Sequence, residues 1–536
     1  MSHFSIRVGQ LGLALSPLVL LLAEACTTNE GDNIYNQGGA GPMGADGKDG
    51  RNGKDGDDGD SGKDGKDGRD GTPGRDGRDG RDGESSGTGG KDPGLPDEYP
   101  SNLPECDEIV PLPELEIDLF GKDGHSFYFE VTPEMRDAQD NQLCDYSRGG
   151  PPYQLGDEVA TCPPAAFNVR IVPSGSTTCT DTGRVGLDLP GQSSWKSWSE
   201  IPNFKLKTDE FEDQKFATGD KNLRFNNGQA ESTIVREATA LAIWRAMGHP
   251  APPTRFVKTQ SNVWDYDFKP GVYAAHVMVQ PYKKAFFSSQ LPNVTDAWEG
   301  EGNPFSGYDS LECEWSKEDD CDRSKLDEVV QVANNAPWGD GFMAATSEVI
   351  DWELVHKNMC LSALTGTGDD WIHNTNNVVI ALGKNGKIFY LPYSTDISGG
   401  HPWYPNTRYD EMWDSSNPAG RCLIDSECRT QALDACDVLI DEFVAFDVVK
   451  NIVEERCEAL ETAELARPAD GPVCESLAKF YDRRPSTLRE ELDEIRDGGG
   501  MGGQGGTSSS GGAYGSGGFG AIGGGFVGSG GVIIID

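Results

Sequence analysis

The sequence lacks several patterns that mark common kinds of enzyme and binding site. It has no Cys-x-x-Cys pair and its seven histidines are scattered, which argues against a zinc site. Between about residue 110 and residue 497 it has neither a Gly-x-Ser-x-Gly elbow nor a His-Glu-x-x-His helix, so the hydrolases that carry those motifs are not indicated. Basic residues are few, because 46 lysines and arginines oppose 88 acidic residues and give a net charge of −42. This charge repels nucleic acid, and we expect none as a partner.

Long apolar runs are scarce, and the one near the amino terminus, residues 11–25, is too short to span a bilayer comfortably. Arg7 precedes it and Ala23-Glu24-Ala25 gives a small-x-small cleavage pattern, so residues 1–25 are predicted to be a signal peptide. Cys26 follows at once, where bacterial lipoproteins carry their lipid. Setting Cys26 aside leaves an even number of the 13 cysteines for disulfides in an oxidising compartment. We predict an exported lipoprotein of the outer membrane or cell surface; the alternative is plain secretion, periplasmic or extracellular, with Cys26 free or paired between chains.

The remaining cysteines cannot be paired from sequence alone, but close spacing favours some pairs. Such crosslinks restrict the unfolded chain and typically contribute about 2–4 kcal/mol each. The favoured pairs are Cys313 with Cys321, Cys422 with Cys428, Cys162 with Cys179, and Cys457 with Cys474.

Glycine recurs at every third position across residues 38–83, mostly in Gly-Lys-Asp and Gly-Arg-Asp triplets. This is the collagen period, because only glycine fits the axis of three wound polyproline-like chains. Proline is nearly absent, with only Pro42 and Pro73, so stability would come from pairs of basic and acidic side chains between chains. The repeat predicts either a self-trimer through residues 38–83, about 140 Å long when wound, or a flexible hydrated spacer.

The stretch from Gly368 to Asp396 has the layout of a phosphoryl-transfer site. Such a reaction needs a carboxylate at the acceptor hydroxyl, and an amide oxygen and a second carboxylate to hold metal against nucleotide phosphates. Asp370, Asn377 and Asp396 supply these groups. Asn377 and Asp396 should meet at one edge, since a hairpin of residues 376–382 and 387–393 turns through an Asn-Gly pair between them.

Two further segments fit a nucleotide site. The strand-like residues 203–208 alternate apolar and basic residues, which puts Lys205 and Lys207 on one face. Residues 232–248 predict a helix that ends at Gly248 and Pro250. Its Glu237 is a candidate partner of the phosphate-clamping lysine.

The order of these motifs, with Gly271-Val272-Tyr273 between them, resembles the CotH kinase family, named after spore coat protein H, over roughly residues 185–400. The resemblance implies a divergent protein kinase that uses ATP with Mg or Mn and phosphorylates surface serines of secreted or coat proteins. Carried over, it makes Asp370 the catalytic base, and Asp396 and Asn377 metal ligands. Lys205 or Lys207 becomes the nucleotide lysine, with Glu237 beside it, and the turn of Gly191, Ser193 and Ser194 covers the phosphates.

Three positions depart from the family pattern. Pro190 stands where the family usually has arginine, Val277 replaces a usual glutamate, and Ser394 replaces the first acidic residue of Trp-Asp-x-Asp. The main prediction is therefore an exported atypical Ser/Thr protein kinase. The alternatives are a catalytically inactive kinase-fold adhesin, and a collagen-stalked structural protein of the cell envelope.

The predicted fold class is α+β, a bilobal kinase-like fold with a strand-rich first lobe and a helical second lobe. Strands are expected at residues 167–172, 203–208, 255–258 and 271–279, and later helices at 347–364, 431–466 and 473–496, with Pro468, Pro472 and Pro485 as interruptions. The expected layout is signal peptide 1–25, anchor segment 26–37, collagen-like repeat 38–83, linker 84–108, kinase-like domain 109–497 and a disordered Gly/Ser-rich tail 498–536.

Overall fold

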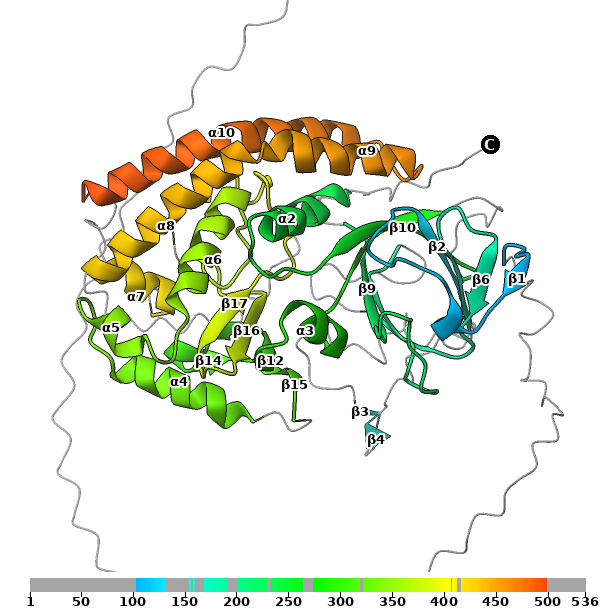
Figure 1. Ribbon diagram of the computed structural model, residues 1–536, viewed down its shortest axis with the longest axis horizontal. Helices are drawn as coiled ribbons and strands as arrows, with labels where there is room; N and C mark the ends of the chain where they lie inside the picture. Colours follow the sequence, from blue (N-terminus) through cyan, green and yellow to red (C-terminus); the bar gives the residue numbers. More distant parts are fainter. Residues whose placement is uncertain are drawn as a thin grey trace, which may run out of the picture. The chain divides into compact units, whose positions relative to one another are not determined.

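The computed structural model describes residues 103–131, 154–155, 158–159, 168–189, 201–228, 233–263, 273–318, 322–405, 407–411 and 416–498. The signal peptide, Cys26, the collagen-like repeat and the Gly/Ser-rich tail lie outside these residues, so those predictions stay predictions. The described part is a mixture of α-helices and β-sheets, as expected (Figure 1). None of the helices within it is both long and apolar enough to cross a membrane.

The early residues form a nine-stranded sheet that is mostly antiparallel, with parallel pairing only of β1 with β6 and of β2 with β10. In sheet order its strands are β1 (Glu108–Ile109), β6 (Thr178–Asp181), β5 (Asn168–Val172), β2 (His125–Glu130), β10 (Thr254–Ser261), β11 (Ala274–Val279), β9 (Asn222–Asn226), β8 (Phe204–Lys207) and β7 (Gly186–Asp188). The four predicted strands are all present, with shifted ends.

This sheet curls around an aromatic core. The ring centroids of Phe129 on β2 and Phe204 on β8 are 4.6 Å apart, although three strands separate β2 from β8 in the sheet. A flat sheet would hold these strands about 19 Å apart at the usual strand spacing. The inward positions of each strand therefore converge and are fully buried, while the alternate positions of β8 and β9 face away from this core.

A second, antiparallel sheet of four strands lies among the helices. Its order is β15 (Glu312–Ser316), β12 (Val294–Gly300), β16 (Val378–Gly383) and β17 (Ile388–Leu391). The predicted hairpin is present as β16 and β17. Gly386 in its turn has a left-handed φ of 78°, as expected for the glycine of an Asn-Gly turn. Short strand pairs complete the described ladders, β13 (Gly302–Asn303) with β14 (Tyr308–Asp309) and β3 (Gln154–Leu155) with β4 (Glu158–Val159).

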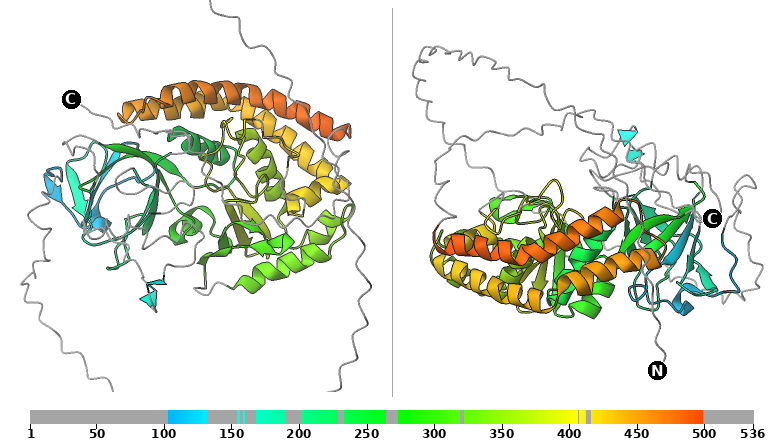
Figure 2. Two further views of the ribbon diagram at one scale, coloured as in Figure 1. Left: turned by 180° about the vertical axis from the view of Figure 1, so that it is seen from behind. Right: turned by 90° about the horizontal axis from the view of Figure 1, so that it is seen from above.

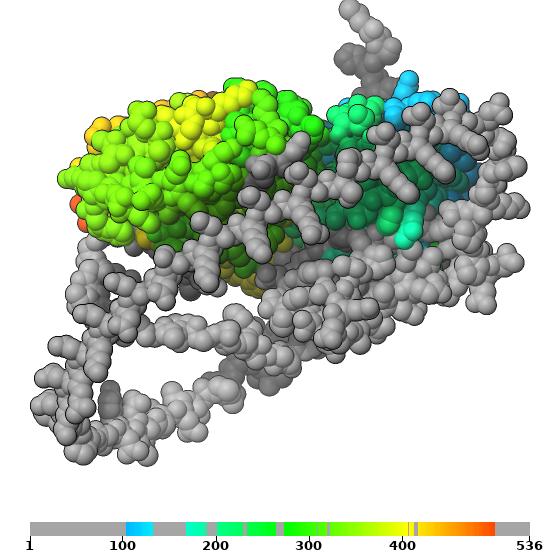
Figure 3. Space-filling view, turned by 90° about the horizontal axis from the view of Figure 1, so that it is seen from below, coloured from blue at the N-terminus to red at the C-terminus, as the bar shows by residue number. Residues whose placement is uncertain are grey.

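Helices dominate the later part of the chain (Figures 1 and 2). They are α2 (Val235–Ala246), α3 (Lys284–Gln290), α4 (Arg323–Asn335), α5 (Phe342–Thr346), α6 (Trp352–Thr365), α7 (Pro418–Ile424), α8 (Ser426–Ala445), α9 (Glu455–Thr462) and α10 (Asp470–Arg496), with 3₁₀ turns η1 (Leu112–Glu114) and η2 (Pro304–Ser306) and the π-turn η3 (Val449–Glu454). The space-filling view shows the green and yellow residues of this part beside the cyan and blue strands (Figure 3).

Helix boundaries differ from the expected ones for physical reasons. The helix expected from residue 347 begins only at Trp352, because Ile350 bridges to Ile388 of β17 and Asp351 caps the helix by accepting from Leu354 N. The expected long helix 431–466 is broken after Ala445, where Asp447 has a left-handed φ of 53°, and resumes through the π-helix η3 into α9, which ends at Thr462. Pro485 was wrongly predicted as an interruption, since α10 runs through it with the proline ring buried.

Four disulfides lie within the described residues, joining Cys106 to Cys179, Cys360 to Cys436, Cys422 to Cys428, and Cys457 to Cys474. The short-loop pairs 422–428 and 457–474 are confirmed. The pairing of Cys162 with Cys179 was wrong, because β1 lies alongside β6 and brings Cys106 to Cys179 from 73 residues away. Cys313 is also disulfide-bonded, and its expected partner Cys321 lies outside the described residues.

Buried polar contacts join the helices to the strand-rich part. Arg467, just before α10, donates to the carbonyl oxygens of Asn227 and Ala275, at 2.8 Å for Asn227. Asp470 accepts from the backbone N of Arg467 at 2.7 Å and from Thr233 Oγ1 at 2.5 Å. These contacts fix the amino end of α10 beside the loops that lead into α2.

Candidate active site

The β16–β17 hairpin brings two predicted metal ligands to one edge. Asn377 lies directly before β16 and Asp396 follows β17 by five residues, so the two ends of the antiparallel pair meet. Ser394 Oγ donates to Asp396 Oδ1 at 3.2 Å. Left-handed backbone at Thr375, Asn377 and Ser394, with φ of 57°, 48° and 51°, surrounds this edge. Such conformations cost energy for residues other than glycine and tend to gather where geometry serves function.

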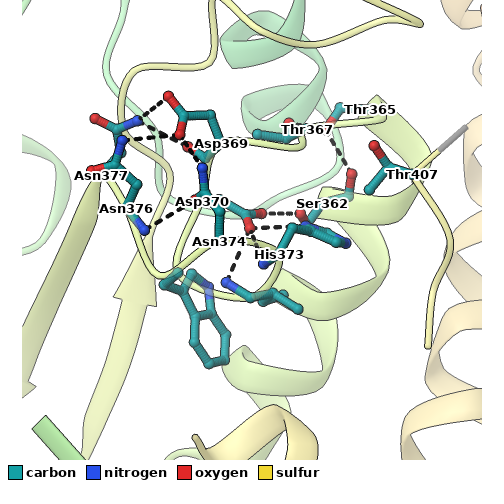
Figure 4. A network of polar contacts seen from close by, with 12 residues as sticks. Ser362, Thr365, Thr367, Asp369, Asp370, His373, Asn374, Asn376, Asn377 and Thr407 are labelled. Carbon is teal, nitrogen blue, oxygen red and sulfur yellow. Dashed lines mark hydrogen bonds and ion pairs between the residues drawn. The ribbon is translucent and has the colours of Figure 1, made fainter. Parts of the chain in front are cut away.

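The carboxylate of Asp369 is surrounded by three asparagine side chains that donate hydrogen bonds to it (Figure 4). It accepts from the side-chain amides of Asn374, Asn376 at 3.0 Å and Asn377 at 2.8 Å. Asn377 Nδ2 also donates to the Asp369 carbonyl oxygen at 2.9 Å. Because its amide nitrogen is committed to Asp369, Asn377 presents its carboxamide oxygen as the remaining polar atom.

Asp370 lies in a separate, buried network. Its Oδ1 accepts from the backbone N of Ile372 at 3.0 Å, and from the backbone N and ring Nδ1 of His373, both at 2.8 Å. Its Oδ2 accepts from the Ser362 hydroxyl of α6. Burial disfavours ionisation of Asp370, but His373 and these hydrogen bonds outweigh it and hold the pKa of Asp370 below its usual value. The same pair raises the pKa of His373 against the effect of burial.

The carboxylate that acts on Asp396 is Asp369. Burial, and then the negative charge of Asp369, raise the pKa of Asp396. Burial and the charge of Asp396 likewise raise the pKa of Glu237 in the first turn of α2. Asn226 of β9 holds Glu237 in place by donating to both of its oxygens, at 2.9 and 2.7 Å. Three carboxylates thus crowd one site, with Glu237 and Asp396 lining a shared small pocket.

The outer face of β8 and β9 supplies the opposite charge. Lys205 lies directly across from Arg224, and Lys207 across from Asn222, so these side chains share the face that points away from the aromatic core. Arg224 donates to Asn226 Oδ1 at 3.0 Å and to the Tyr393 hydroxyl. Despite burial, Tyr393 and then the carboxylates of Glu237, Glu299 and Asp396 raise the pKa of Arg224.

The charge of Lys205 reaches the opposite wall of the site. Burial and the charge of Glu299 on β12 raise the pKa of Glu314 on β15, while Lys283 and, to a smaller extent, Lys205 lower it. Lys283 pairs with Glu314 at 2.8 Å from the start of α3. Cations of the nine-stranded sheet therefore face carboxylates of the four-stranded sheet, the hairpin loop and α2.

Residues 189–483 match the family described as CotH kinase protein. This is more than half of the chain, and it includes β8, α2 and the hairpin that carries Asn377 and Asp396. The chain belongs to the CotH kinase family. No curated protein matches it.

Membership in the CotH kinase family indicates an atypical kinase-like protein and, in general, the use of a nucleotide with a divalent metal. The donors present suit such a metal, because carboxylate and amide oxygens are the ligands of Mg²⁺ and Mn²⁺. The raised pKa values of Glu237 and Asp396 record a local excess of negative charge that a bound cation would neutralise. The site therefore fits a divalent metal.

Some of the predicted site residues lie at this CotH site and others do not. The structure brings Glu237 close to Asp396 and ties Asn377 to Asp369, which acts on Asp396. Lys205 lies opposite Arg224, with Lys207 on the same strand face. Asp370 lies close to Asn377 in sequence but is enclosed in its own network. Gly191, Ser193 and Ser194 lie outside the described residues. The cation whose charge acts on Glu237 is Arg224, rather than the expected lysine.

Two of the family departures are visible in the structure. Val277 of β11 is buried and lines the pocket of Glu237 and Asp396 with methyl groups. Ser394 supports Asp396 by a hydrogen bond in place of a second carboxylate.

Sequence reasoning missed Arg224, Asn226 and Asp369. The alternation of residues 222–226 is the same signal that identified Lys205 and Lys207, so β9 could have been read as a second half of the cationic face. No sequence signal separates Asp369 from Asp370, because the turn decides which of two adjacent carboxylates faces the site.

Proposed function

We propose that the protein is an ATP-dependent protein kinase of the CotH family that transfers the γ-phosphate to serine or threonine hydroxyls. The observation that carries this proposal is the cationic face of β8 and β9 opposite Glu237, Asp369 and Asp396. A metal–nucleotide complex needs both charges at once, cations for phosphate oxygens and carboxylates for the metal. Lys205 and Arg224 lie directly opposite each other on neighbouring strands, an arrangement of like charges that a bound anion stabilises.

Each residue has a part in this proposal. Asp396 and the carboxamide oxygen of Asn377 would hold Mg²⁺ or Mn²⁺, which supplies charge neutralisation at the phosphates when bound. Lys205 and Arg224 bind and orient the phosphates, and Glu237 with Asn226 keeps Arg224 in place. Arg224 thereby supplies a cation to a site in which Pro190 stands in place of the family's arginine.

We propose Asp369, in place of Asp370, as the base that accepts the proton of the acceptor hydroxyl. Asp369 is partly exposed and close enough to Asp396 to change its pKa, whereas Asp370 is buried and is held by Ser362 and His373. The carboxylates of both residues accept hydrogen bonds inside the protein, so the difference between them lies in their exposure and in what they face. Asp370 and His373 are then positioning residues that fix the turn bearing Asp369.

The exported location, the lipid at Cys26 and the trimer through residues 38–83 remain part of the proposal. The four disulfides of the described residues are consistent with an oxidising compartment. The acidic chain favours basic, serine-bearing surface proteins as substrates.

The test is phosphate incorporation by the purified disulfide-bonded protein, with γ-labelled ATP, Mn²⁺ or Mg²⁺, and a basic serine-containing acceptor. We expect transfer that is lost in Asp396→Asn and in Lys205→Ala, while an exposed control, Arg489→Gln, keeps the wild-type rate. ATP-dependent thermal stabilisation without transfer would support the inactive kinase-fold protein. Absence of both would overturn the kinase proposal.

A further inference from the structure

Three arginines converge on a cavity at the end of α2 that is opposite to Glu237. Arg245 lies in the last turn of α2, Arg255 is the second residue of β10, and Arg456 is on α9. All three line one cavity of about 670 Å³. Helix α2 packs against both α9 and β10, beside which it lies in Figure 1. Glu237 is in the first turn of the 12-residue α2, so Arg245 is more than two helical turns, over about 10 Å, from it.

These guanidinium groups repel one another. Burial and the charge of Arg255 lower the pKa of Arg245. Burial, Arg255 and Arg245 lower the pKa of Arg456, against the opposite effects of Asp123 and Glu455. In the described part of the chain, none of the three forms an ion pair with a carboxylate within 4.0 Å. By contrast, Arg323 and Arg408 each bind two carboxylates.

Main-chain oxygens hold two of the arginines in position. Arg245 Nη1 donates to the Ala251 carbonyl at 3.2 Å, and Arg255 Nη1 donates to the Thr254 carbonyl at 2.7 Å. Within the described part of the chain, the other N–H groups of these two guanidinium groups have no hydrogen-bond acceptor, so they can bind a ligand. In a chain with a net charge of −42, three cations gathered without carboxylate partners point to an anion that comes from outside the chain.

Two carboxylates, Asp118 and Asp220, also line the cavity, and among the described residues neither pairs with the three arginines within 4.0 Å. Asp220 is buried and already accepts from Thr218 Oγ1 and Gln280 Nε2, both at 2.7 Å. Asp118 is exposed to solvent. Gln280, Thr218 and Ser289 add neutral polar groups to the lining.

We propose that the cavity formed by Arg245, Arg255 and Arg456 binds a phosphate monoester dianion, at a site separate from that of the nucleotide. The planar guanidinium fork matches phosphate oxygens in pairs, and a dianion satisfies more than one fork. The cavity has the volume of a small-molecule site, so it accommodates a free phosphate, a phosphorylated metabolite or a phosphorylated side chain.

The experiment uses the full chain and calorimetric titration with inorganic phosphate, phosphoserine and serine at constant ionic strength. We expect saturable binding of phosphate and phosphoserine and none of serine. Phosphoserine binding about tenfold tighter than phosphate identifies a modified protein as the source, whereas equal binding identifies the free anion.

Variants locate the site. Arg255→Gln and Arg456→Gln should each weaken phosphate binding about tenfold or more. They should fold at least as stably as the wild type without ligand, because each removes a repelling charge. The Arg255→Lys variant keeps the positive charge but loses the planar guanidinium group, so it should also bind phosphate weakly. Arg489→Gln, in an exposed ion pair with Asp441, should bind normally.

A kinase-site variant separates this proposal from the proposed function. Asp396→Asn should retain phosphate binding even if it abolishes phosphoryl transfer. The proposal is overturned by absence of saturable binding, by normal binding in Arg255→Gln and Arg456→Gln, or by loss of binding in Asp396→Asn, which would place the anion in the nucleotide site.

Discussion

The choice between Asp369 and Asp370 as the base gives the sharpest test of the proposed mechanism. The two residues are adjacent, yet Asp369 faces the site while Asp370 is enclosed by Ser362, Ile372 and His373. The perturbation is a matched pair of variants, Asp369→Asn and Asp370→Asn, each with its alanine counterpart. We expect the asparagine variants to separate catalysis from stability.

The structure sets the expected sizes. Alanine at position 370 leaves up to four buried donors without an acceptor, and at about 1–3 kcal/mol for each donor, partly relieved by rearrangement, we expect a loss of about 3–5 kcal/mol. Asp370→Asn keeps an oxygen for the three donors at Oδ1 and turns its amide to the Ser362 hydroxyl, so about 1–2 kcal/mol is expected. At position 369, both variants should lower the transfer rate about 100-fold or more, with a stability change of about 1–2 kcal/mol.

The assay combines initial rates of phosphate transfer with urea unfolding midpoints measured on the same preparations. Asp370→Asn should be measurably destabilised yet retain most of its transfer rate below the transition. If Asp370→Asn is folded but inactive while Asp369→Asn transfers phosphate at a near-normal rate, the assignment of the base is refuted.

Further predictions concern the charged groups. Because the pKa values of Glu237 and Asp396 are raised, the metal-free protein loses stability as the pH rises through these pKa values. Mn²⁺ should therefore raise the unfolding temperature more at pH 8 than at pH 5.5. The Asp396→Asn variant should lose this Mn²⁺-dependent increase. The pKa of His373 is raised and the pKa of Asp370 is lowered, so their ion pair stabilises the fold between the ordinary Asp pKa of 3.8 and the raised pKa of His373. The difference in urea midpoint between the wild type and His373→Asn should therefore become smaller when the pH exceeds the raised pKa of His373. Arg484→Ala should cost about 3–5 kcal/mol of unfolding free energy, because it leaves a buried carboxylate unpaired.

Each of these predictions has a control and a contrary result. An equal Mn²⁺ response in Asp396→Asn would remove Asp396 from the metal site. A difference in urea midpoint between the wild type and His373→Asn that does not change with pH would mean that Asp370 and His373 are not both ionised. For the buried pair, Lys479→Ala removes an exposed ion pair and should change stability by less than about 0.5 kcal/mol, so equal effects of the two variants would contradict the burial argument.

Much of the site was predictable because it depends on local patterns. Alternation in residues 203–208 placed Lys205 and Lys207 on one strand face, and the Asn-Gly turn fixed a hairpin whose ends hold Asn377 and Asp396. The helix bearing Glu237 was expected from its end at Gly248 and Pro250.

Features that depend on long-range contacts were predicted poorly. The partner of Cys179 is 73 residues away, across a parallel strand pair, and spacing along the chain gives no information about it. Pro485 stays inside α10 because packing compensates for the lost backbone hydrogen bond, which a local rule does not see.

The sequence by itself determined which elements form and which chemical groups they carry, because strand alternation, helix caps and turn glycines act over a few residues. Only the tertiary structure decided that Arg224 is the cation beside Glu237, that Asp369 faces Asp396, and that Arg245, Arg255 and Arg456 share one cavity. The physical reason is that electrostatic fields and desolvation depend on distances across the fold, and distant segments acquire these distances only when the sheets curl and the helices pack against them.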